Sequence, residues 1–140
     1  MPGMVRRAGA TVALSLVGVA LWRSVHRVEV VGMSMAPALE PGDRLIVVGR
    51  PWFQPPWPRP GQVVAVGDPR DPRRLLIKRV GAVHHDDDTL EVVGDAAEAS
   101  TDSRTFGPVP RSSIVGRAVY RYAPTGRRGP LPRAGEYHRA

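Results

Sequence analysis

Residues 74–80 read R-L-L-I-K-R-V, an apolar run that is interrupted by basic side chains. A strand places alternate side chains on opposite faces, so Leu76, Lys78 and Val80 share one face of this segment. Because both neighbours of Lys78 on that face are apolar, the lysine is expected to point into the interior. The segment therefore predicts a β-strand that carries a lysine on its buried face.

Lys78 is also unusual in the composition of the chain. Lysine and arginine together number 20, and Lys78 is the one lysine among them. Arginine stays protonated in proteins, whereas burial disfavours the charged form of lysine and lowers its pKa. Such a lysine can act as a general base near neutral or mildly alkaline pH. The alternative is a chance survivor of an arginine-rich composition on a solvent face, and the pattern alone favours neither.

Short valine-rich runs surround this strand on both sides. Each is bounded by Gly, Pro or Asp, and several strands at this spacing indicate an antiparallel sandwich or barrel. The expected fold is mainly β, a small antiparallel β-barrel or sandwich with H-H-D-D-D (84–88) at a hairpin tip. The expected strands are 27–31, 44–48, 62–66, 74–80, 89–93 and 114–120.

The first 26 residues have a different character. The stretch A-G-A-T-V-A-L-S-L-V-G-V-A-L-W (8–22) is uncharged, and a helix over it would be about 22 Å long, which is marginal against a bilayer core of about 30 Å. It can be a short membrane anchor, the apolar region of a cleaved signal peptide, or a helix packed on the domain. Trp22 at the boundary, arginines on both sides and the lack of a clear small-x-small cleavage site favour the anchor. Residues 1–26 are therefore expected to be an N-terminal apolar helix in the cell membrane, with the facing side undetermined.

The net charge of +7 is concentrated at the two ends of the chain. Residues 1–27 carry four arginines and no acid, residues 111–140 carry seven arginines and one acid, and residues 28–110 are mildly acidic. This distribution argues against nucleic-acid binding and suits an anionic membrane surface. Residues 124–140 lack periodicity and are expected to form a basic disordered tail, which leaves 27–123 as the folded domain.

A serine stands out in G-M-S-M-A-P-A-L-E-P-G-D (32–43), directly after the first expected strand. The prolines indicate an extended or turn segment that displays Ser34, although a serine in such a place is usually only a turn residue. A nucleophilic serine needs a group that accepts its proton. No histidine lies between strand elements that would fix its ring against Ser34, and G-M-S-M-A does not fit the G-x-S-x-G elbow. A Ser-His-Asp triad is therefore not expected.

A further polar cluster occupies G-D-A-A-E-A-S-T-D-S-R-T-F-G-P-V-P (94–110), which is a loop by composition. Its Ser100, Asp102 and Arg104 are polar groups that can form a hydrogen-bonded support. An ion pair between Asp102 and Arg104 is the simplest interpretation of this pattern.

These blocks, taken in order, resemble the type I signal peptidase family. The matching motifs are G-x-S-M-x-P, then G-D at 42–43, then the strand with K-R-V, then a second G-D followed by S-x-D-S-R-x-F-G-P-V-P. The resemblance covers about residues 28–123. It implies a small β-fold with a Ser-Lys dyad, in which Lys78 takes the proton of Ser34 as the hydroxyl attacks a peptide carbonyl.

The resemblance also implies roles for the supporting residues. Ser100 matches the serine that helps to orient the lysine, and Asp102 and Arg104 match the buried pair that holds the site together. Some family members carry a serine hydroxyl at the position of Gly32. This donor is missing here, so an oxyanion hole made of backbone groups is expected, including the N–H of Ser34.

The resemblance extends to a subgroup and carries two departures. Ala38 replaces the usual threonine and Ala96 the usual asparagine, and neither change removes a catalytic group. The compact core and the F-G-P-V-P…G-R-A-x-x-R-Y-x-P ending look like the nickel-type superoxide dismutase maturation proteases, which remove an amino-terminal extension. The expected partners are a precursor protein and, through residues 8–22, a membrane. No cofactor, metal or nucleic acid is expected.

Three other functions compete with this one. The first is a general type I signal peptidase that cleaves exported preproteins. The second is a self-cleaving regulatory module, which the absence of a helix-turn-helix pattern argues against. The third is a non-enzymatic binding module with the same fold.

Overall fold

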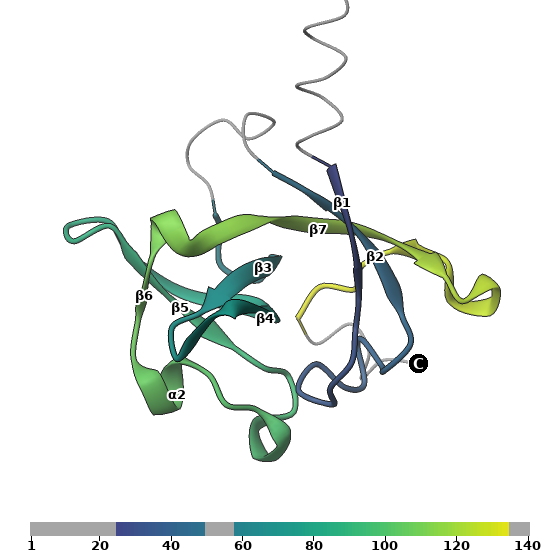
Figure 1. The fold of residues 1–140 in the computed structure, drawn as a ribbon, viewed down its shortest axis with the longest axis horizontal. Coiled ribbons are helices and arrows are strands. Elements are labelled where there is room, and N and C mark those ends of the chain that lie inside the picture. The colour runs from purple at the N-terminus through teal and green to yellow at the C-terminus, as the bar shows by residue number, and fades with distance from the viewer. Residues whose placement is uncertain (1–24, 50–57, 135–140) are drawn as a thin grey trace, which may run out of the picture.

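A computed structural model describes residues 25–49 and 58–134 of the chain. They form one eight-stranded antiparallel sheet in the order β1-β2-β7-β3-β4-β5-β6, and β8 pairs with β7. Figure 1 shows β7 extending across the molecule, with β1 and β2 at one end and β5 and β6 at the other. The strands are β1 Val25–Glu29, β2 Arg44–Val48, β3 Val63–Asp68, β4 Asp71–His84, β5 Thr89–Val93, β6 Val109–Pro110, β7 Ile114–Ala123 and β8 Gly129–Pro130. One short helix, α2 Ser103–Phe106, and three 3-10 turns, η1 Ala97–Ala99, η2 Arg111–Ser113 and η3 Thr125–Arg127, lie in the connections.

The sheet is buried on both faces at its centre, and β3 shows why. Its run V-V-A-V has no polar residue, so alternate side chains enter two different cores. Val63 and Ala65 belong to one core cluster, which also contains Leu45 and Met35. Val64 and Val66 belong to a second cluster, formed with residues of β4 to β7. The curled sheet therefore encloses two small cores instead of one.

Strand β4 has a free edge along its first half. It pairs with β3 through residues 71–79, whereas β5 pairs with it only from Arg79 to His84. Strand β1 pairs with β2, and no strand in the described part of the chain pairs with its other edge. These two unpaired edges border the cleft described below.

The structure confirms the mainly β, antiparallel character and the hairpin tip at 84–88, which joins β4 to β5. The sheet is open and not a closed barrel, because the two-residue β6 pairs with β5 and does not reach β1. Strand β1 begins at Val25, two residues before the expected domain boundary.

Residues 124–140 were expected to form a disordered tail, but the first part of this segment is folded. Residues 125–127 form η3, and β8 pairs with Tyr120 and Arg121 of β7. This segment is held in place because Leu131 packs against the first core cluster and Arg127 forms ion pairs described below. The apolar stretch 8–22 and residues 135–140 lie outside the described residues. Within residues 25–49 and 58–134, no helix is long and apolar enough to cross a bilayer.

Candidate active site

Ser34 lies on a loop whose two ends are tied together. The Val30 N–H donates to the Asp43 carbonyl and the Gly42 N–H donates to the Val30 carbonyl, both at 2.8 Å. Gly42 has a φ of 92°, a left-handed conformation that favours glycine. Met35 is buried in the core while Ser34 stays half-buried, so packing of its neighbour fixes the serine at the surface.

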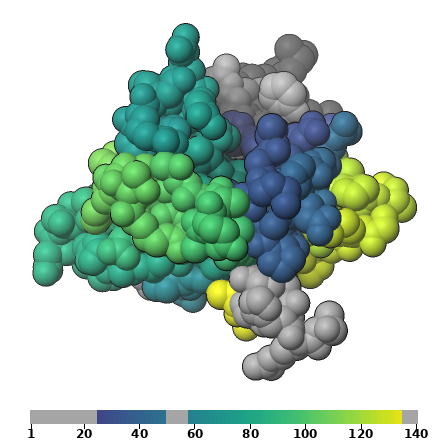
Figure 2. Space-filling view, turned by 90° about the horizontal axis from the view of Figure 1, so that it is seen from below, coloured from purple at the N-terminus to yellow at the C-terminus, as the bar shows by residue number. Residues whose placement is uncertain are grey.

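The backbone of Ser34 is anchored on one side and open on the other. Its carbonyl accepts a hydrogen bond from the Ala96 N–H at 2.9 Å, which joins the Ser34 loop to the loop after β5. Within residues 25–49 and 58–134, nothing accepts a hydrogen bond from the Ser34 N–H. Figure 2 shows the blue segment that carries Ser34 lying against the green segment around residue 100. The site is thus formed where two loops distant in sequence meet.

Lys78 begins a chain of hydrogen bonds that leads into the protein. Its Nζ donates to Ser100 Oγ at 2.9 Å, and Ser100 Oγ donates to Asp102 Oδ2 at 2.6 Å. Because the Ser100 proton is directed at the carboxylate, its oxygen can only accept from Lys78. A neutral Lys78 amine therefore keeps its lone pair available for another partner.

Asp102 is the centre of this hydrogen-bond network. Its side chain is fully buried and accepts from the Gly94 N–H at 2.8 Å, in addition to Ser100. The Arg104 guanidinium donates to both carboxylate oxygens, at 3.0 and 2.6 Å. Burial acts to raise the pKa of Asp102, but the hydrogen bonds from Arg104, Gly94 and Ser100 outweigh it and hold that pKa well below its usual range. Asp102 is therefore an anion at all ordinary pH values.

The expected buried pair is buried on one side only. The Asp102 side chain is 0% exposed, whereas that of Arg104 is 48% exposed. Arg104 lies on the short surface helix α2, and Asp102 caps this helix by accepting from the Arg104 N–H at 3.0 Å. The guanidinium therefore covers the carboxylate from the solvent side.

The pKa of Lys78 is lowered from its usual value of 10.5. Burial is the largest cause, and the positive charges of Arg104 and Arg70 act in the same direction. The Asp102 charge opposes these effects without outweighing them. Lys78 is 3% exposed, as the alternation in 74–80 predicts. The geometry thus favours a neutral amine at a lower pH than for a lysine in water.

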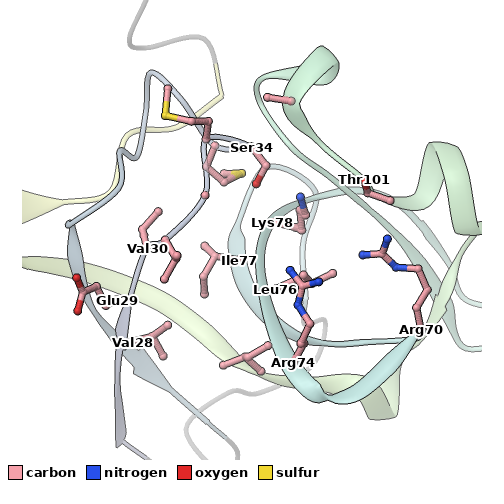
Figure 3. A pocket seen from close by; sticks show the side chains of 16 residues that line it. Val28, Glu29, Val30, Ser34, Arg70, Arg74, Leu76, Ile77, Lys78 and Thr101 are labelled. Atoms are coloured by element: carbon pink, nitrogen blue, oxygen red, sulfur yellow. The ribbon is translucent and has the colours of Figure 1, made fainter.

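Ser34 and Lys78 line the same cleft, which has a volume of about 310 Å³. Figure 3 shows their side chains turned toward each other at one end of it. One wall is formed by residues 28–35 and the other by residues 74–78 of β4. Gly32 lines the cleft too, and a Cβ at this position would meet nothing within 4 Å.

Arg79, the neighbour of Lys78, is held by an ion pair of its own. Its guanidinium donates to both oxygens of Asp95 at 2.8 and 2.7 Å, and both side chains are 5% exposed. It also donates to the carbonyls of Gly61 and Pro132. These contacts fix the backbone of β4 beside Lys78.

A second buried carboxylate secures the Ser34 loop. The Asp43 side chain is 2% exposed and pairs with Arg121 and Arg127, each at 3.0 Å. Arg121 also donates to the Ala38 carbonyl at 3.0 Å. Burial acts to raise the pKa of Asp43, but hydrogen bonds from the Glu40 N–H and the two arginines hold it below 3.8. The C-terminal segment thereby clamps the loop that carries Ser34.

We expect Asp43→Asn to lower the free energy of unfolding at pH 7 by about 2–4 kcal/mol, because Arg121 and Arg127 lose the buried carboxylate that they share, while Arg127 keeps its pair with the half-exposed Glu40. Urea denaturation measures the change. The difference from wild type should shrink as the pH falls through the folded-state pKa of Asp43, since a lowered carboxyl pKa stabilises the fold only above it. Asp71→Asn is the control, because its partner Arg73 is 91% exposed, and it should change the stability by less than about 1 kcal/mol. Equal effects of the two changes at pH 7 would contradict the clamp.

The structure brings together all the site residues that the sequence singles out. Ser34, Gly32 and Lys78 line one cleft, and Ser100, Asp102 and Arg104 form the network behind the lysine.

Sequence reasoning missed the roles of Asp43, Asp95 and Gly94. The G-D pairs at 42–43 and 94–95 were the available signal, because each of these buried aspartates forms an ion pair with arginine. A third G-D pair, at 67–68, follows the same pattern, since its buried aspartate pairs with Arg70. The distant partners Arg121 and Arg127 carried no local signal.

Comparison with known proteins assigns the family. A sequence profile described as signal peptidase, peptidase S26, matches residues 5–87 and 86–123. The chain is 32% identical over 120 residues to mitochondrial ATP-independent inner membrane protease subunit 1b of Arabidopsis thaliana, covering 71% of each chain. It is 30% identical over 148 residues to mitochondrial inner membrane protease subunit 2 of Schizosaccharomyces pombe, covering 86% of this chain and 82% of the relative.

A bacterial relative is similar as well. The chain is 28% identical over 141 residues to probable signal peptidase I-1 of Synechocystis, covering 70% of this chain and 71% of the relative. The chain therefore belongs to the signal peptidase family, peptidase S26, and is a serine peptidase.

Proposed function

We propose that this peptidase uses Ser34 as nucleophile and Lys78 as general base to remove an N-terminal extension from a precursor protein. The observation that carries the proposal is the placement of Lys78. It is buried, it shares a cleft with Ser34, and it is oriented by a serine whose own proton is directed at Asp102. This arrangement provides a neutral amine whose lone pair is free to accept the Ser34 proton.

The chemistry proceeds in two halves. Lys78 takes the hydroxyl proton while Ser34 Oγ bonds to the scissile carbonyl carbon, and the oxyanion accepts from the Ser34 N–H. The C–N bond then breaks, and Lys78 returns the proton to the leaving amine. Water attacks the acyl-enzyme with its proton going to Lys78, and that proton passes to Ser34 as the acid product leaves.

The cleft suits a substrate in an extended conformation. It lies between the free edges of β1 and β4, whose backbone groups can pair with an added strand. Residues 74–77 form the wall that leads to Lys78, and residues 28–33 form the wall that leads to Ser34. A peptide bound between them would present its carbonyl to both residues of the dyad.

We further propose that the substrate is the precursor of a nickel-type superoxide dismutase and that residues 8–22 attach the protein to a membrane. The compact core and the sequence after F-G-P-V-P support the substrate. The names of the mitochondrial relatives support the membrane, because they describe inner membrane proteases. The relative named as a probable signal peptidase supports a second candidate substrate, an exported preprotein.

A cleavage assay tests these assignments. Full-length wild type and Ser34→Ala are incubated separately with a nickel superoxide dismutase precursor and with an exported preprotein, and mass spectrometry identifies the new N-terminus. A single serine-dependent cut near the start of the dismutase precursor supports the whole proposal. Serine-dependent cleavage of the preprotein alone keeps the dyad and changes the substrate. Equal cleavage by Ser34→Ala would exclude Ser34 as the nucleophile.

The pH dependence of kcat/KM provides an independent prediction. Lys78 acts as a base only when neutral, and its pKa in the fold is lowered. We therefore expect kcat/KM to rise tenfold per pH unit on the acid side and to level off above a pKa that is below 10.5. Asp102 stays ionised throughout and adds no second step. Steady-state rates on a peptide substrate measure this profile, and a maximum in acid solution would exclude Lys78 as the base.

A further inference from the structure

The two walls of the cleft carry opposite charges at the end away from the dyad. Glu29 lies on the β1 wall, five residues before Ser34, and Arg74 lies on the β4 wall, four residues before Lys78. Figure 3 shows Glu29 and Arg74 on opposite sides of the cleft, with Arg70 on the same side as Arg74. Small or apolar side chains form most of the remaining lining, so these charges dominate the field at this end.

Arg70 is already held by the protein. Its guanidinium donates to both oxygens of Asp68 at 3.0 and 2.8 Å and lies 5.7 Å from the centre of the Phe106 ring. The Asp68 side chain is 1% exposed because Arg70 covers it. This ion pair fixes the Arg70 side chain where it lines the cleft.

Arg74 differs from Arg70 in having no such partner. It is exposed, and within residues 25–49 and 58–134 no carboxylate lies within ion-pair distance of it, although its charge acts from farther away on the buried Asp68. Glu29 on the opposite wall lies 4.0 Å from Arg44 Nε and so already has a basic neighbour. The guanidinium of Arg74 is thus available to a carboxylate that enters the cleft.

The strand geometry gives the position of that carboxylate. Arg74 and Lys78 lie on the same face of β4, and four residues at about 3.3 Å each separate them by about 13 Å. A bound peptide in an extended conformation has the same rise per residue. The group opposite Arg74 is therefore about four residues from the scissile bond.

The geometry points to a substrate with an aspartate or glutamate about four residues from the scissile bond, bound by Arg74. Guanidinium groups pair with carboxylates in a planar, two-bond geometry that a lysine or an amide does not reproduce. This specificity rests on the proposed dyad, because Ser34 and Lys78 set the position of the scissile bond.

A charge scan of the substrate tests the inference. Fluorogenic peptides spanning the cleaved junction of whichever precursor the wild type processes are made with Asp, Asn or Lys at each of the six positions on either side. Full-length wild type, Arg74→Glu and Arg73→Glu are compared at low salt. Arg73 is the matched control because it is adjacent, exposed, paired with Asp71 and absent from the cleft lining.

We expect the wild type to prefer Asp over Lys about 5-fold in kcat/KM at one position about four residues from the junction, mainly through KM. The preference should weaken at high salt. Arg74→Glu should reverse it at that position alone, and Arg73→Glu should keep it. An identical Asp-to-Lys ratio at every position in wild type and Arg74→Glu overturns the inference while leaving the dyad intact. Absence of Ser34-dependent cleavage of every peptide overturns the dyad, and the inference with it.

Discussion

Replacing Lys78 by arginine is expected to lower kcat/KM by at least about 10³-fold, although the positive charge is kept. Arginine cannot lose its proton in a protein, so it cannot accept the proton of Ser34. The buried site also offers little room for a guanidinium, because Lys78 is 3% exposed and its Nζ already contacts Ser100 at 2.9 Å. Rates on a peptide that the wild type cleaves measure the loss.

Lys78→Met separates loss of the base from loss of the fold. Methionine has a similar length and packs with the apolar neighbours Leu76 and Val80, so the free energy of unfolding should be equal to or higher than that of wild type. Its activity should nevertheless fall as far as that of Lys78→Arg. If either variant keeps more than about one tenth of the wild-type rate, Lys78 is not the general base.

The strands and the inward lysine could be predicted because their causes are local. Alternation in R-L-L-I-K-R-V depends only on neighbours along the chain, and Lys78 does lie on the buried face. The V-V-A-V run of β3 likewise predicted a strand. It did not predict two cores, because that requires knowing which elements cover each face of the sheet.

The ends of the folded domain could not be predicted because their contacts are distant in sequence. Residues 124–134 look like a tail by composition, yet Arg127 pairs with Asp43, 84 residues away. Nothing near Arg127 in sequence indicates this partner. The openness of the sheet has the same origin, since it depends on whether β6 can reach β1 in space.

The sequence predicted which residues support Lys78, but it did not predict how they are arranged. The pattern S-x-D-S-R suggested a bond between Asp102 and Arg104, which the structure confirms. The resemblance implied that both members of this pair are buried, but the loop has no alternation that would indicate exposure, and Arg104 proves to be half exposed. The sequence also did not predict that the Ser34 loop and the loop after β5 come close together at Gly94, because a glycine in a loop normally indicates only a turn.

Gly94→Ala is expected to lower kcat by about 10²-fold or more, because Gly94 leaves no room for a side chain between the two loops of the site. An added Cβ would lie 2.6 Å from Ser100 Cβ and 2.6 Å from the Ser34 carbonyl oxygen, and would also clash with Ser100 Oγ. Two of these atoms belong to the serine that orients Lys78 and the third to the proposed nucleophile. Relief of the clash must therefore separate Ser34 from Lys78, and a displacement of about 1 Å can cost about 10²-fold in rate.

Alanine substitutions at two other glycines distinguish a loss of kcat caused by a displaced dyad from a loss of stability caused by overpacking. A Cβ at Gly116 would lie 2.6 Å from the Val48 carbonyl oxygen, whereas one at Gly126 would meet nothing within 4 Å. Gly94→Ala and Gly116→Ala should each lower the free energy of unfolding by about 1–3 kcal/mol, and Gly126→Ala should leave it nearly unchanged. Activity is then measured well below the lowest Tm of the three, so that all are folded.

Because all three variants are folded under these conditions, a difference in kcat between them reports on the position of the dyad and not on the folded fraction. Gly116 lies in β7, away from the cleft, so Gly116→Ala should keep a kcat near that of wild type once the protein is folded. Gly94→Ala should keep its low kcat at every temperature, because the added Cβ displaces Ser100, which orients Lys78, and Ser34, the proposed nucleophile. If Gly94→Ala instead matches Gly116→Ala in kcat, the contact of the Ser34 loop with the loop after β5 stabilises the fold without positioning the dyad.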